Sequence, residues 1–417
     1  MNYVLKKIFD LANKYKDKRD FKGTFFGDKI NLLDKKRLVI YGAGSFAKEL
    51  YLTLKFHNID IDCFCDKDTN KVGTKLLDKN IISVDELVDK YKDELIIIGI
   101  NNDQKQIVEE LVKLGFDKNN LVGCKTEENY FLSMYGMIGT QAVLNEIKAH
   151  DIEKFFYKEE DEILQAYEIF KDNMSKELFL MKMALFVSGG DYFLFKDFIK
   201  SFSLPYKKFR HLGISKVTED FYYFNNDVLS IKNNEVYVDV GAFDGDTILE
   251  FVKYCQQNKL NYKKIYGFEP DEKCLQLLKN NTKGIDSLEI IDKGLWEHTT
   301  TLSFTISEDA IHEQAASIDK RNLADKKIKV VSLDDFFQNK KITFLKMDPG
   351  GNVIPNIIKG GKNILKRDKP KMAVGAYHSV KSLYEIPLMV KEIVPEYEIY
   401  LRHGTYHLSD TDMFAYV

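Results

Sequence analysis

Acids and glycines placed close together mark one stretch of the sequence as a candidate ligand site. The stretch Asn234 to Thr247 reads NEVYVDVGAFDGDT, an apolar run that ends around Asp239 and is followed by Gly241, Asp244 and Gly245. A carboxylate in such a run is costly unless a partner satisfies it. Strand, glycine turn and helix in succession open the nucleotide-binding unit of α/β domains. The acid before the first glycine suits a ligand with a cationic amino-acid end, such as S-adenosylmethionine, although any strand-to-helix turn could show the same pattern.

Two further acidic sites follow later apolar runs. Glu269 ends the run KKIYGFEPD, 30 residues after Asp239, and could accept hydrogen bonds from both hydroxyls of a ribose. Asp292 and Gly294 lie in LEIIDKGLW, where the loop after a third strand would meet an adenine. Because Pro270 begins a helical pattern, the alternative for Glu269 is an acid favoured by a helix N-terminus.

A base for removing a hydroxyl proton has three candidates. In-line methyl transfer to a hydroxyl needs a positioned base that works near neutral pH. His378, at the end of KMAVGAYH, is the first candidate, with Asp348 of ITFLKMDPGG and His403 of YLRH behind it. A lone histidine is also commonly a hydrogen-bonded structural residue. The three could hold a metal together, but their spacing does not require one, and we predict none.

These residues need a fold that brings them to one edge of a sheet. From residue 233 the chain repeats strand and helix patterns five times and ends with the strand patterns YEIYLRH and DMFAYV. This order predicts an α/β domain of the class I methyltransferase fold, with a mostly parallel seven-stranded sheet and a terminal antiparallel hairpin. The acids that follow strands one, two and four would then lie along the carboxyl edge, where α/β sheets bind ligands.

A second glycine motif lies near the N-terminus. Gly42, Gly44 and Ala47 have the spacing G-x-G-x-x-[GA], and Asp66 ends the next apolar run, where an acid can meet a ribose hydroxyl. The unit resembles the small domain in front of bacterial sugar-modifying enzymes, which can hold a nucleotide or nucleotide-sugar. The alternative is a structural or dimerising module, which would fit a homo-oligomer.

Four segments follow from these patterns. We predict an N-terminal helix and linker over residues 1–34, a Rossmann-like domain over 35–124, a helical connector over 125–232 and a methyltransferase domain over 233–417. The connector has apolar residues at helical spacing. The aromatic run from Phe221 to Phe224 could form the apolar wall of a substrate pocket or pack the linker against the sheet.

Composition excludes several classes of function. The 417 residues are 44% hydrophobic and 30% charged, with a net charge of −3, as in soluble globular proteins. No basic tract suggests a nucleic-acid partner, and no run of about 18 apolar residues could span a membrane. The five cysteines are odd in number and form no C-x-x-C pair. That usage favours reduced thiols in the cytoplasm over a disulfide framework.

The C-terminal part closely resembles the FkbM family of S-adenosylmethionine-dependent methyltransferases. The shared motifs occur in the family's order over roughly residues 220–417: VYVDVGAFDGDT, YGFEPD, KGLW, VVSLDDFF, FLKMD, the YH at 377–378, and YLRH. The resemblance implies methylation of an oxygen, commonly on a sugar of a surface glycan or an antibiotic. It also implies that Asp348 lies at the catalytic edge. The residues that it implies for binding the methyl donor are Asp239, Gly241, Glu269 and Asp292.

One motif departs from the family. After the strand-four aspartate the family usually has D-x-E-G, whereas this chain reads DPGG over residues 348–351. From the resemblance we expect a sugar O-methyltransferase with a small-molecule or glycan acceptor. Because of the DPGG turn we keep a catalytically degenerate donor-binding or scaffold protein as the alternative. An NAD-dependent sugar oxidoreductase that uses Gly42, Gly44 and Asp66 is disfavoured, because no hydride-handling set is evident beside these residues.

Overall fold

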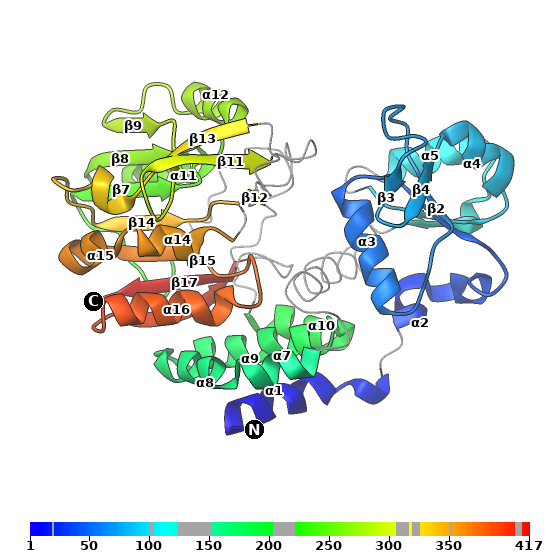
Figure 1. Ribbon diagram of the computed structural model, residues 1–417, viewed down its shortest axis with the longest axis horizontal. Helices are drawn as coiled ribbons and strands as arrows, with labels where there is room; N and C mark the ends of the chain where they lie inside the picture. Colours follow the sequence, from blue (N-terminus) through cyan, green and yellow to red (C-terminus); the bar gives the residue numbers. More distant parts are fainter. Residues whose placement is uncertain are drawn as a thin grey trace. The chain divides into compact units, whose positions relative to one another are not determined.

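A computed structural model describes residues 1–18, 21–100, 104–123, 152–202, 222–305, 317–318, 326–350, 352–404 and 411–417. The chain divides into two compact units, each with its own sheet (Figure 1). One comprises Met1–Leu5, Lys158–Leu180 and Ser201–Val417, and the other comprises Lys6–Tyr157 and Met181–Lys200. Cys124, Phe221, Gly351 and much of the predicted connector lie outside the described residues.

A seven-stranded sheet with the order β16-β17-β15-β14-β7-β8-β9 forms the centre of the first unit. Its strands are β7 (Glu235–Val240), β8 (Tyr262–Phe268), β9 (Leu288–Ile291), β14 (Phe344–Met347), β15 (Lys371–Gly375), β16 (Glu398–His403) and β17 (Thr411–Tyr416). Strand β17 is antiparallel to β15 and β16, whereas the other neighbours pair in parallel. The predicted fold class, a mostly parallel sheet with a terminal antiparallel hairpin, is confirmed.

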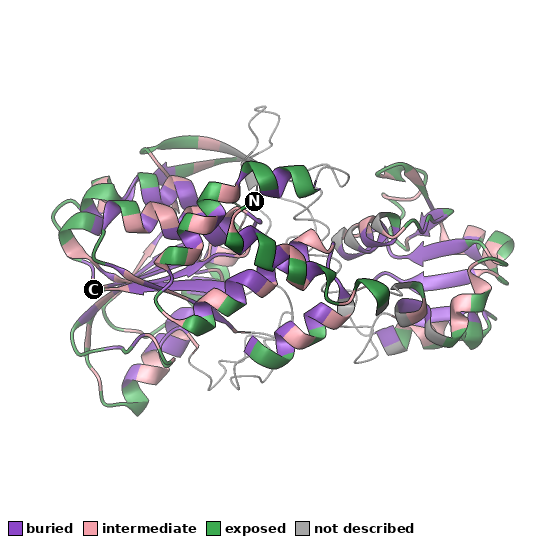
Figure 2. Ribbon diagram, turned by 90° about the horizontal axis from the view of Figure 1, so that it is seen from below, coloured by how far each residue is buried: buried purple, intermediate pink, exposed green. Residues whose placement is uncertain are grey.

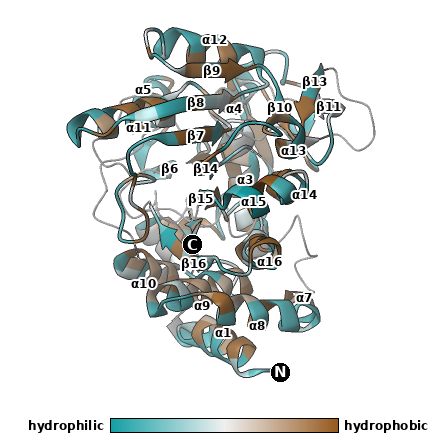
Figure 3. Ribbon diagram, turned by 90° about the vertical axis from the view of Figure 1, so that its left-hand side faces the viewer, coloured by the Kyte–Doolittle hydropathy of each residue, from teal (hydrophilic) through white to brown (hydrophobic). Residues whose placement is uncertain are grey.

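Helices connect and cover these strands. They are α11 (Asp246–Gln257), α12 (Glu272–Asn281), α13 (Leu333–Phe336), α14 (Ile354–Lys359), α15 (Lys362–Asp368) and α16 (Ser382–Ile393). Figure 2 shows the strands as buried and the outer sides of the helices as exposed. In Figure 3, hydrophilic residues prevail on outer helices such as α8 and α12, whereas β9 is hydrophobic. The central strands β14 and β15 are almost wholly buried, as strands of a parallel sheet covered by helices are.

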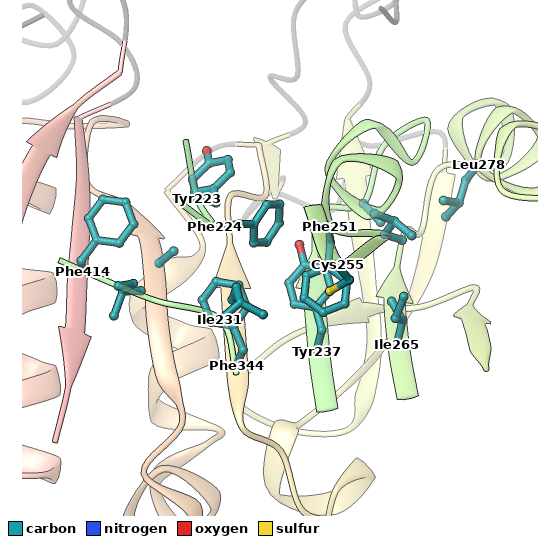
Figure 4. Close-up of a cluster of buried hydrophobic side chains, with 14 of the residues drawn as sticks. Tyr223, Phe224, Ile231, Tyr237, Phe251, Cys255, Ile265, Leu278, Phe344 and Phe414 are labelled. Atoms are coloured by element: carbon teal, nitrogen blue, oxygen red, sulfur yellow. The ribbon is translucent and has the colours of Figure 1, made fainter. Parts of the chain in front are cut away.

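The main core of this unit lies on one face of the sheet. Tyr237 and Phe344, on adjacent strands, stack with ring centroids 5.3 Å apart, and Phe251 of α11 packs on Tyr237 (Figure 4). Of the aromatic run predicted as a pocket wall or as packing, Tyr223 and Phe224 are buried in this core. Because side chains alternate along a strand, Asp239 points to the same face as Tyr237, and Lys346 to the same face as Phe344.

A separate four-stranded sheet was not predicted. It has the order β10-β13-β11-β12, with strands β10 (Gly294–Leu295), β13 (Lys326–Val331), β11 (Thr300–Thr305) and β12 (Ser317–Ile318). The sequence placed the end of the third strand near Asp292 and Gly294, and β9 ends at Ile291, after which the chain bends. Gly294 instead pairs with Val330 in the second sheet. The apolar pattern alone could not separate two short strands joined by a bend.

The second unit contains a six-stranded sheet with the order β3-β4-β2-β1-β5-β6. Its strands are β1 (Leu38–Tyr41), β2 (Cys63–Cys65), β3 (Lys75–Leu76), β4 (Lys79–Ile82), β5 (Leu95–Ile98) and β6 (Leu121–Gly123). Only β3 and β4 pair antiparallel. The connecting helices are α3 (Ser45–Phe56), α4 (Val84–Tyr91) and α5 (Gln104–Lys113). The second glycine motif lies between β1 and α3.

Further helices lie before and between the two sheets along the chain. They are α1 (Tyr3–Asn13), α2 (Phe21–Phe26), α7 (Ile152–Lys158), α8 (Glu160–Ile169), α9 (Asn173–Val187) and α10 (Tyr192–Phe202). Within the predicted connector, helices occur over 152–202, whereas the described residues 222–232 form turns and no helix. Within the described residues, no helix is long and apolar enough to cross a bilayer.

A buried arginine attaches the start of α9 to the seven-stranded sheet. Arg402 of β16 is 2% exposed, and its guanidinium forms ion pairs with Asp172 and Asp227. The backbone N–H of Leu401 also donates to the hydroxyl of Ser175, at 2.9 Å. These contacts hold the segment that enters α9 beside the end of β16.

Candidate active site

The glycine turn after β7 is shaped by a close approach of the chain after β14. Gly241 has φ +78° and Gly245 has φ +89°, a region that favours glycine. A Cβ on Gly241 would lie 2.8 Å from both the carbonyl oxygen of Asp348 and the Cα of Pro349. The turn predicted to hold the methyl donor is therefore in contact with the turn that carries the predicted catalytic acid.

Glu269 follows β8 and places its carboxylate over the glycine turn. One carboxylate oxygen accepts the backbone N–H of Phe243 at 3.0 Å, and the other accepts that of Asp271 at 2.9 Å. The residue is 7% exposed. Burial raises the pKa of Glu269 from 4.5 to about 7, although these two backbone N–H groups oppose the rise. A carboxylate has about four lone-pair sites, so acceptor capacity remains for a ligand.

Asp239 is fully buried and has its own cationic partner. The ammonium of Lys346, on the adjacent strand β14, lies 3.0 Å from one carboxylate oxygen, and the hydroxyl of Thr247 donates to the other. Lys346 also donates to the carbonyl oxygen of Gly241, at 3.2 Å. Burial raises the pKa of Asp239, while the charge of Lys346 opposes the rise. The partner that an acid in an apolar strand requires is therefore this lysine.

Sequence reasoning missed Lys346, although a signal was present. FLKMD places a lysine inside an apolar strand pattern, just as VYVDV places an aspartate inside another. Each buried charge alone would be costly, so opposite charges in two adjacent buried strands indicate a pair. The parallel register places Lys346 directly beside Asp239.

Asp348 and His378 come together at the carboxyl edge. Strand β15 ends at Gly375, so His378 lies in the loop after it rather than at the strand end that the sequence predicted. One oxygen of Asp348 accepts a hydrogen bond from the hydroxyl of Tyr377 at 2.8 Å and lies 3.2 Å from Nε2 of His378. A Cβ on Gly375 would lie 2.7 Å from that same oxygen, so glycine leaves the space that the carboxylate occupies.

The electrostatics of this cluster favour an ionised aspartate. Burial would raise the pKa of Asp348, but the hydrogen bond and charge of His378, with help from Lys346 and Tyr377, hold it below its ordinary value. The Asp348 and His378 side chains are 11% and 14% exposed, so both are largely buried and keep a small exposed area. The arrangement can orient an imidazole and places a carboxylate beside it.

The other predicted residues are spread along the same edge. His403, at the end of β16, is fully buried, and its Nδ1 lies 2.9 Å from the Thr411 hydroxyl across the hairpin. Asp292 is exposed just after β9. A Cβ on Gly294 would lie 3.7 Å from Pro270, which follows Glu269. Asp244 is buried and accepts the backbone N–H of Asp246 at 3.2 Å, which places it at the start of α11.

Comparison with known families identifies the C-terminal part. The family model of the methyltransferase FkbM domain matches residues 239–407, a range that begins at Asp239 and contains Glu269, Asp348 and His378. The C-terminal part of this chain belongs to the FkbM methyltransferase family. It is an S-adenosylmethionine-dependent methyltransferase domain, as the sequence motifs indicated. A second family model, named C2185-like, N-terminal, matches residues 34–122.

Two solved structures show how far the fold of this chain is shared with other proteins. The methyltransferase FkbM from Methylobacillus flagellatus KT is 18% identical, with a TM-score of 0.56 and coverage of 99% of each chain, so the fold is shared over the whole length. Aeropyrum pernix fibrillarin, solved with natively bound S-adenosyl-L-methionine, is 11% identical over 46% of this chain and 70% of its own, with a TM-score of 0.29. No curated protein matches the chain in sequence.

The glycine turn of the second unit is bonded to an acid, as the glycine turn of the FkbM domain is. Gly42 has φ +113°, and a Cβ there would lie 2.7 Å from the carbonyl oxygen of Gly99. Gly44 immediately precedes α3. Asp66 follows β2, and its carboxylate accepts the backbone N–H of Ala43 at 2.8 Å, just as Glu269 accepts that of Phe243. In both units an acid after the second parallel strand is bonded to the glycine turn.

In the parts of the chain that the structure describes, no group of three or more His, Cys, Asp or Glu side chains is arranged to hold a metal ion.

Proposed function

We propose that the FkbM domain binds S-adenosylmethionine along the carboxyl edge of its sheet and methylates a hydroxyl group of a sugar, on a surface glycan or a related metabolite. The observation that carries this proposal is the carboxylate of Glu269, fixed over the glycine turn by two backbone N–H groups. A ribose presents two adjacent hydroxyl donors, and this carboxylate retains acceptor capacity for both. The acceptor class is supported by the family resemblance.

The remaining methyl-donor contacts follow from position. The glycine turn brings backbone close to a ligand, with Gly241 and Gly245 in conformations that few side chains allow. The loop with Asp292 and Gly294, beside Pro270, is proposed to meet the adenine. Asp244, at the start of α11, is proposed to face the amino-acid end. When bound, the methyl donor supplies an electrophilic methyl group on a positively charged sulfur.

His378 is the proposed base. With Nε2–H donating to Asp348, Nδ1 of the imidazole is the nitrogen that takes the proton of the acceptor hydroxyl. The pKa of Asp348 is held low, so its carboxylate is ionised at neutral pH and stabilises the imidazolium that forms. The Tyr377 hydroxyl donates to the same oxygen and fixes the carboxylate. His403, buried and bonded to Thr411, takes no part in the proposed chemistry.

A second function, a donor-binding protein without catalysis, is favoured by one observation. The turn after β14 has Gly350 where the family usually has a glutamate. If that glutamate orients the acceptor, the chain would bind S-adenosylmethionine and transfer nothing. The Asp348–His378 pair favours catalysis over this alternative, because it supplies a base and its orienting acid without that glutamate.

The test is mass spectrometry of surface glycans from a strain that lacks the gene. We expect loss of one methyl-sized mass increment, restored by the wild type but not by His378→Ala. His298→Ala is the matched control, because its side chain is 80% exposed and it is distant from His378 in sequence. Equal restoration by His378→Ala would exclude the proposed base. Restoration by neither the wild type nor a Gly350→Glu variant would exclude a glycan acceptor.

We also propose a nucleotide or nucleotide-sugar for the N-terminal unit. Asp66 would accept a ribose hydroxyl there, supported by its contact with the glycine turn. Thermal-shift titration with ADP and UDP-glucose should raise the melting temperature of the wild type and not that of Asp66→Ala. Asp62→Ala is the control, since Asp62 is exposed. No shift of the melting temperature in the wild type or either variant, together with a dimer in sedimentation, would instead favour the dimerising role.

We place the protein in the cytoplasm, since the described cysteines are free thiols.

A further inference from the structure

We infer that Lys346 is a positioning residue. It fixes the glycine turn, which holds the methyl donor, against strand β14, which leads to Asp348. The inference rests on the proposed function, because it concerns how the same site is held together. Lys346 is 4% exposed and lies on β14, two residues before Asp348. Its ammonium lies between the carboxylate of Asp239, at 3.0 Å, and the carbonyl oxygen of Gly241, at 3.2 Å.

The contacts of Gly241 show why this link matters for geometry. The carbonyl oxygen of Gly241 is held by Lys346, and a Cβ on Gly241 would lie 2.8 Å from backbone atoms of Asp348 and Pro349. The same glycine therefore contacts β14 and its following turn twice, once before the catalytic acid and once beside it. A shift of Gly241 would move the cradle of the methyl donor relative to Asp348 and His378. Misplacement of reacting groups by about 1 Å can cost on the order of 100-fold in rate.

Stability alone does not explain why Lys346 and Asp239 form a buried ion pair at this position. Buried pairs commonly contribute little net stability compared with apolar side chains of similar size, so stability is a weak reason for this one. What the ammonium adds is a hydrogen bond to a turn carbonyl, which an apolar side chain could not make. Thr247, at the start of α11, donates to the other oxygen of Asp239, so the pair also fixes the helix that follows the turn.

The chain contains a matched control at the opposite edge of the same sheet. Lys371, the first residue of β15, forms an ion pair with Glu235, the first residue of β7, and the hydroxyl of Thr343 donates to the second Glu235 oxygen. The chemistry is that of Lys346, Asp239 and Thr247, with side chains 18% and 3% exposed for Lys371 and Glu235. This pair lies at the amino ends of the strands, away from the glycine turn.

The experiment compares Lys346→Met with Lys371→Met in the full chain. Both substitutions leave a buried carboxylate without its cation, so both should lower the melting temperature. Calorimetric titration below the melting range should show S-adenosylmethionine affinity at least tenfold weaker in Lys346→Met and within twofold of wild type in Lys371→Met. Equal affinities in the two variants would overturn the inference. Failure of the wild type itself to bind would overturn the proposed function instead.

A double variant separates position from stability. Asp239→Asn combined with Lys346→Met removes both buried charges, so the melting temperature should recover relative to Lys346→Met alone. Affinity for S-adenosylmethionine should stay weak, because the Gly241 carbonyl is still not held. Hydrogen exchange gives a readout that needs no ligand: amides 241–247 should exchange faster in the double variant and not in Lys371→Met. Recovery of affinity together with unchanged exchange would show that Lys346 serves stability alone.

Discussion

The carboxylate of Glu269 accepts the backbone N–H of Phe243 at 3.0 Å, which ties the end of β8 to the glycine turn after β7. In the N-terminal unit the carboxylate of Asp66 makes the same contact with Ala43 at 2.8 Å. The longer glutamate reaches the second residue after its first glycine, and the shorter aspartate reaches the first. In both cases the acid is fixed before any ligand arrives, which reduces the ordering cost of binding.

The burial of Glu269 predicts a pH dependence of stability. Its pKa in the folded chain is raised from 4.5 to about 7, so the folded state holds a proton that the unfolded state has lost between those values. The stabilisation is fully present below pH 4.5 and is lost as pH rises through 7, on the order of 3 kcal/mol. Chemical denaturation between pH 5 and 8 should show this fall in the wild type. Glu269→Gln should lack that part of the slope, and identical slopes would contradict the assignment.

The same group predicts how methyl-donor affinity changes with pH. Ribose hydroxyls donate more strongly to an ionised carboxylate than to a neutral carboxyl. Affinity for S-adenosylmethionine should therefore rise as pH increases through about 7, and calorimetry at pH 6 and 8 measures it. In Glu269→Gln the affinity should be weak at both pH values. A wild-type affinity that is constant over this range would mean that the carboxylate does not meet the ribose.

Removing the acid behind the base should affect chemistry and spare binding. Asp348→Asn leaves His378 without the charge that stabilises its protonated form, and we expect kcat to fall about 100-fold or more. Affinity for S-adenosylmethionine should change little. Tyr377→Phe is the milder comparison, because it removes one hydrogen bond and keeps the ring. Methyl transfer from labelled donor to glycan of the deletion strain measures each rate, and a normal rate in Asp348→Asn would remove this residue from the mechanism.

Gly375 predicts a steric effect at the same carboxylate. An added Cβ would lie 2.7 Å from the oxygen of Asp348 that contacts Tyr377 and His378. Gly375→Ala should displace that side chain, lower the transfer rate and cost about 1–3 kcal/mol of stability. Gly123→Ala is the control, because its Cβ would meet nothing closer than 3.5 Å. Thermal melts and transfer rates that match this control would show that Asp348 can relocate at no cost.

The departure from the family motif gives a further prediction. If the Asp348–His378 pair suffices, Gly350→Glu should change the transfer rate of the wild type by less than tenfold. If the chain is a donor-binding protein, transfer should be undetectable in the wild type and should appear in Gly350→Glu. The same labelled-donor measurement decides between the two.

The sequence predicted the seven-stranded sheet, because five of its strands, β7, β8, β9, β14 and β15, end at or just before an acid or a glycine. It also predicted that Asp348 and His378 would share an edge, since carboxyl ends of parallel strands meet there. Their hydrogen bond could not be predicted, because His378 lies in a loop after β15 whose path is set by packing. The second sheet escaped because Gly294 pairs with Val330, a contact between segments distant in sequence.

For Lys346, the sequence showed the charge but not its partner. Its charge in an apolar strand was visible, but which acid would pair with it depends on strand order, and β14 lies next to β7 only after a long excursion of the chain. The reverse holds for Glu269: its place after β8 followed from the sequence, whereas its bond to Phe243 depends on the turn geometry. Position along an edge is therefore readable from sequence, while the contacts that fix each side chain are not.

Calorimetric titration of S-adenosylmethionine into the wild type, Glu269→Ala and Glu272→Ala tests the central claim most directly. Glu272 is exposed and lies in the first turn of α12, close to Glu269 in sequence. The account predicts binding to the wild type and Glu272→Ala with equal affinity, and about 100-fold weaker binding or none to Glu269→Ala, from the loss of two charge-assisted hydrogen bonds. Unchanged affinity in Glu269→Ala, or no heat with the wild type, would contradict it.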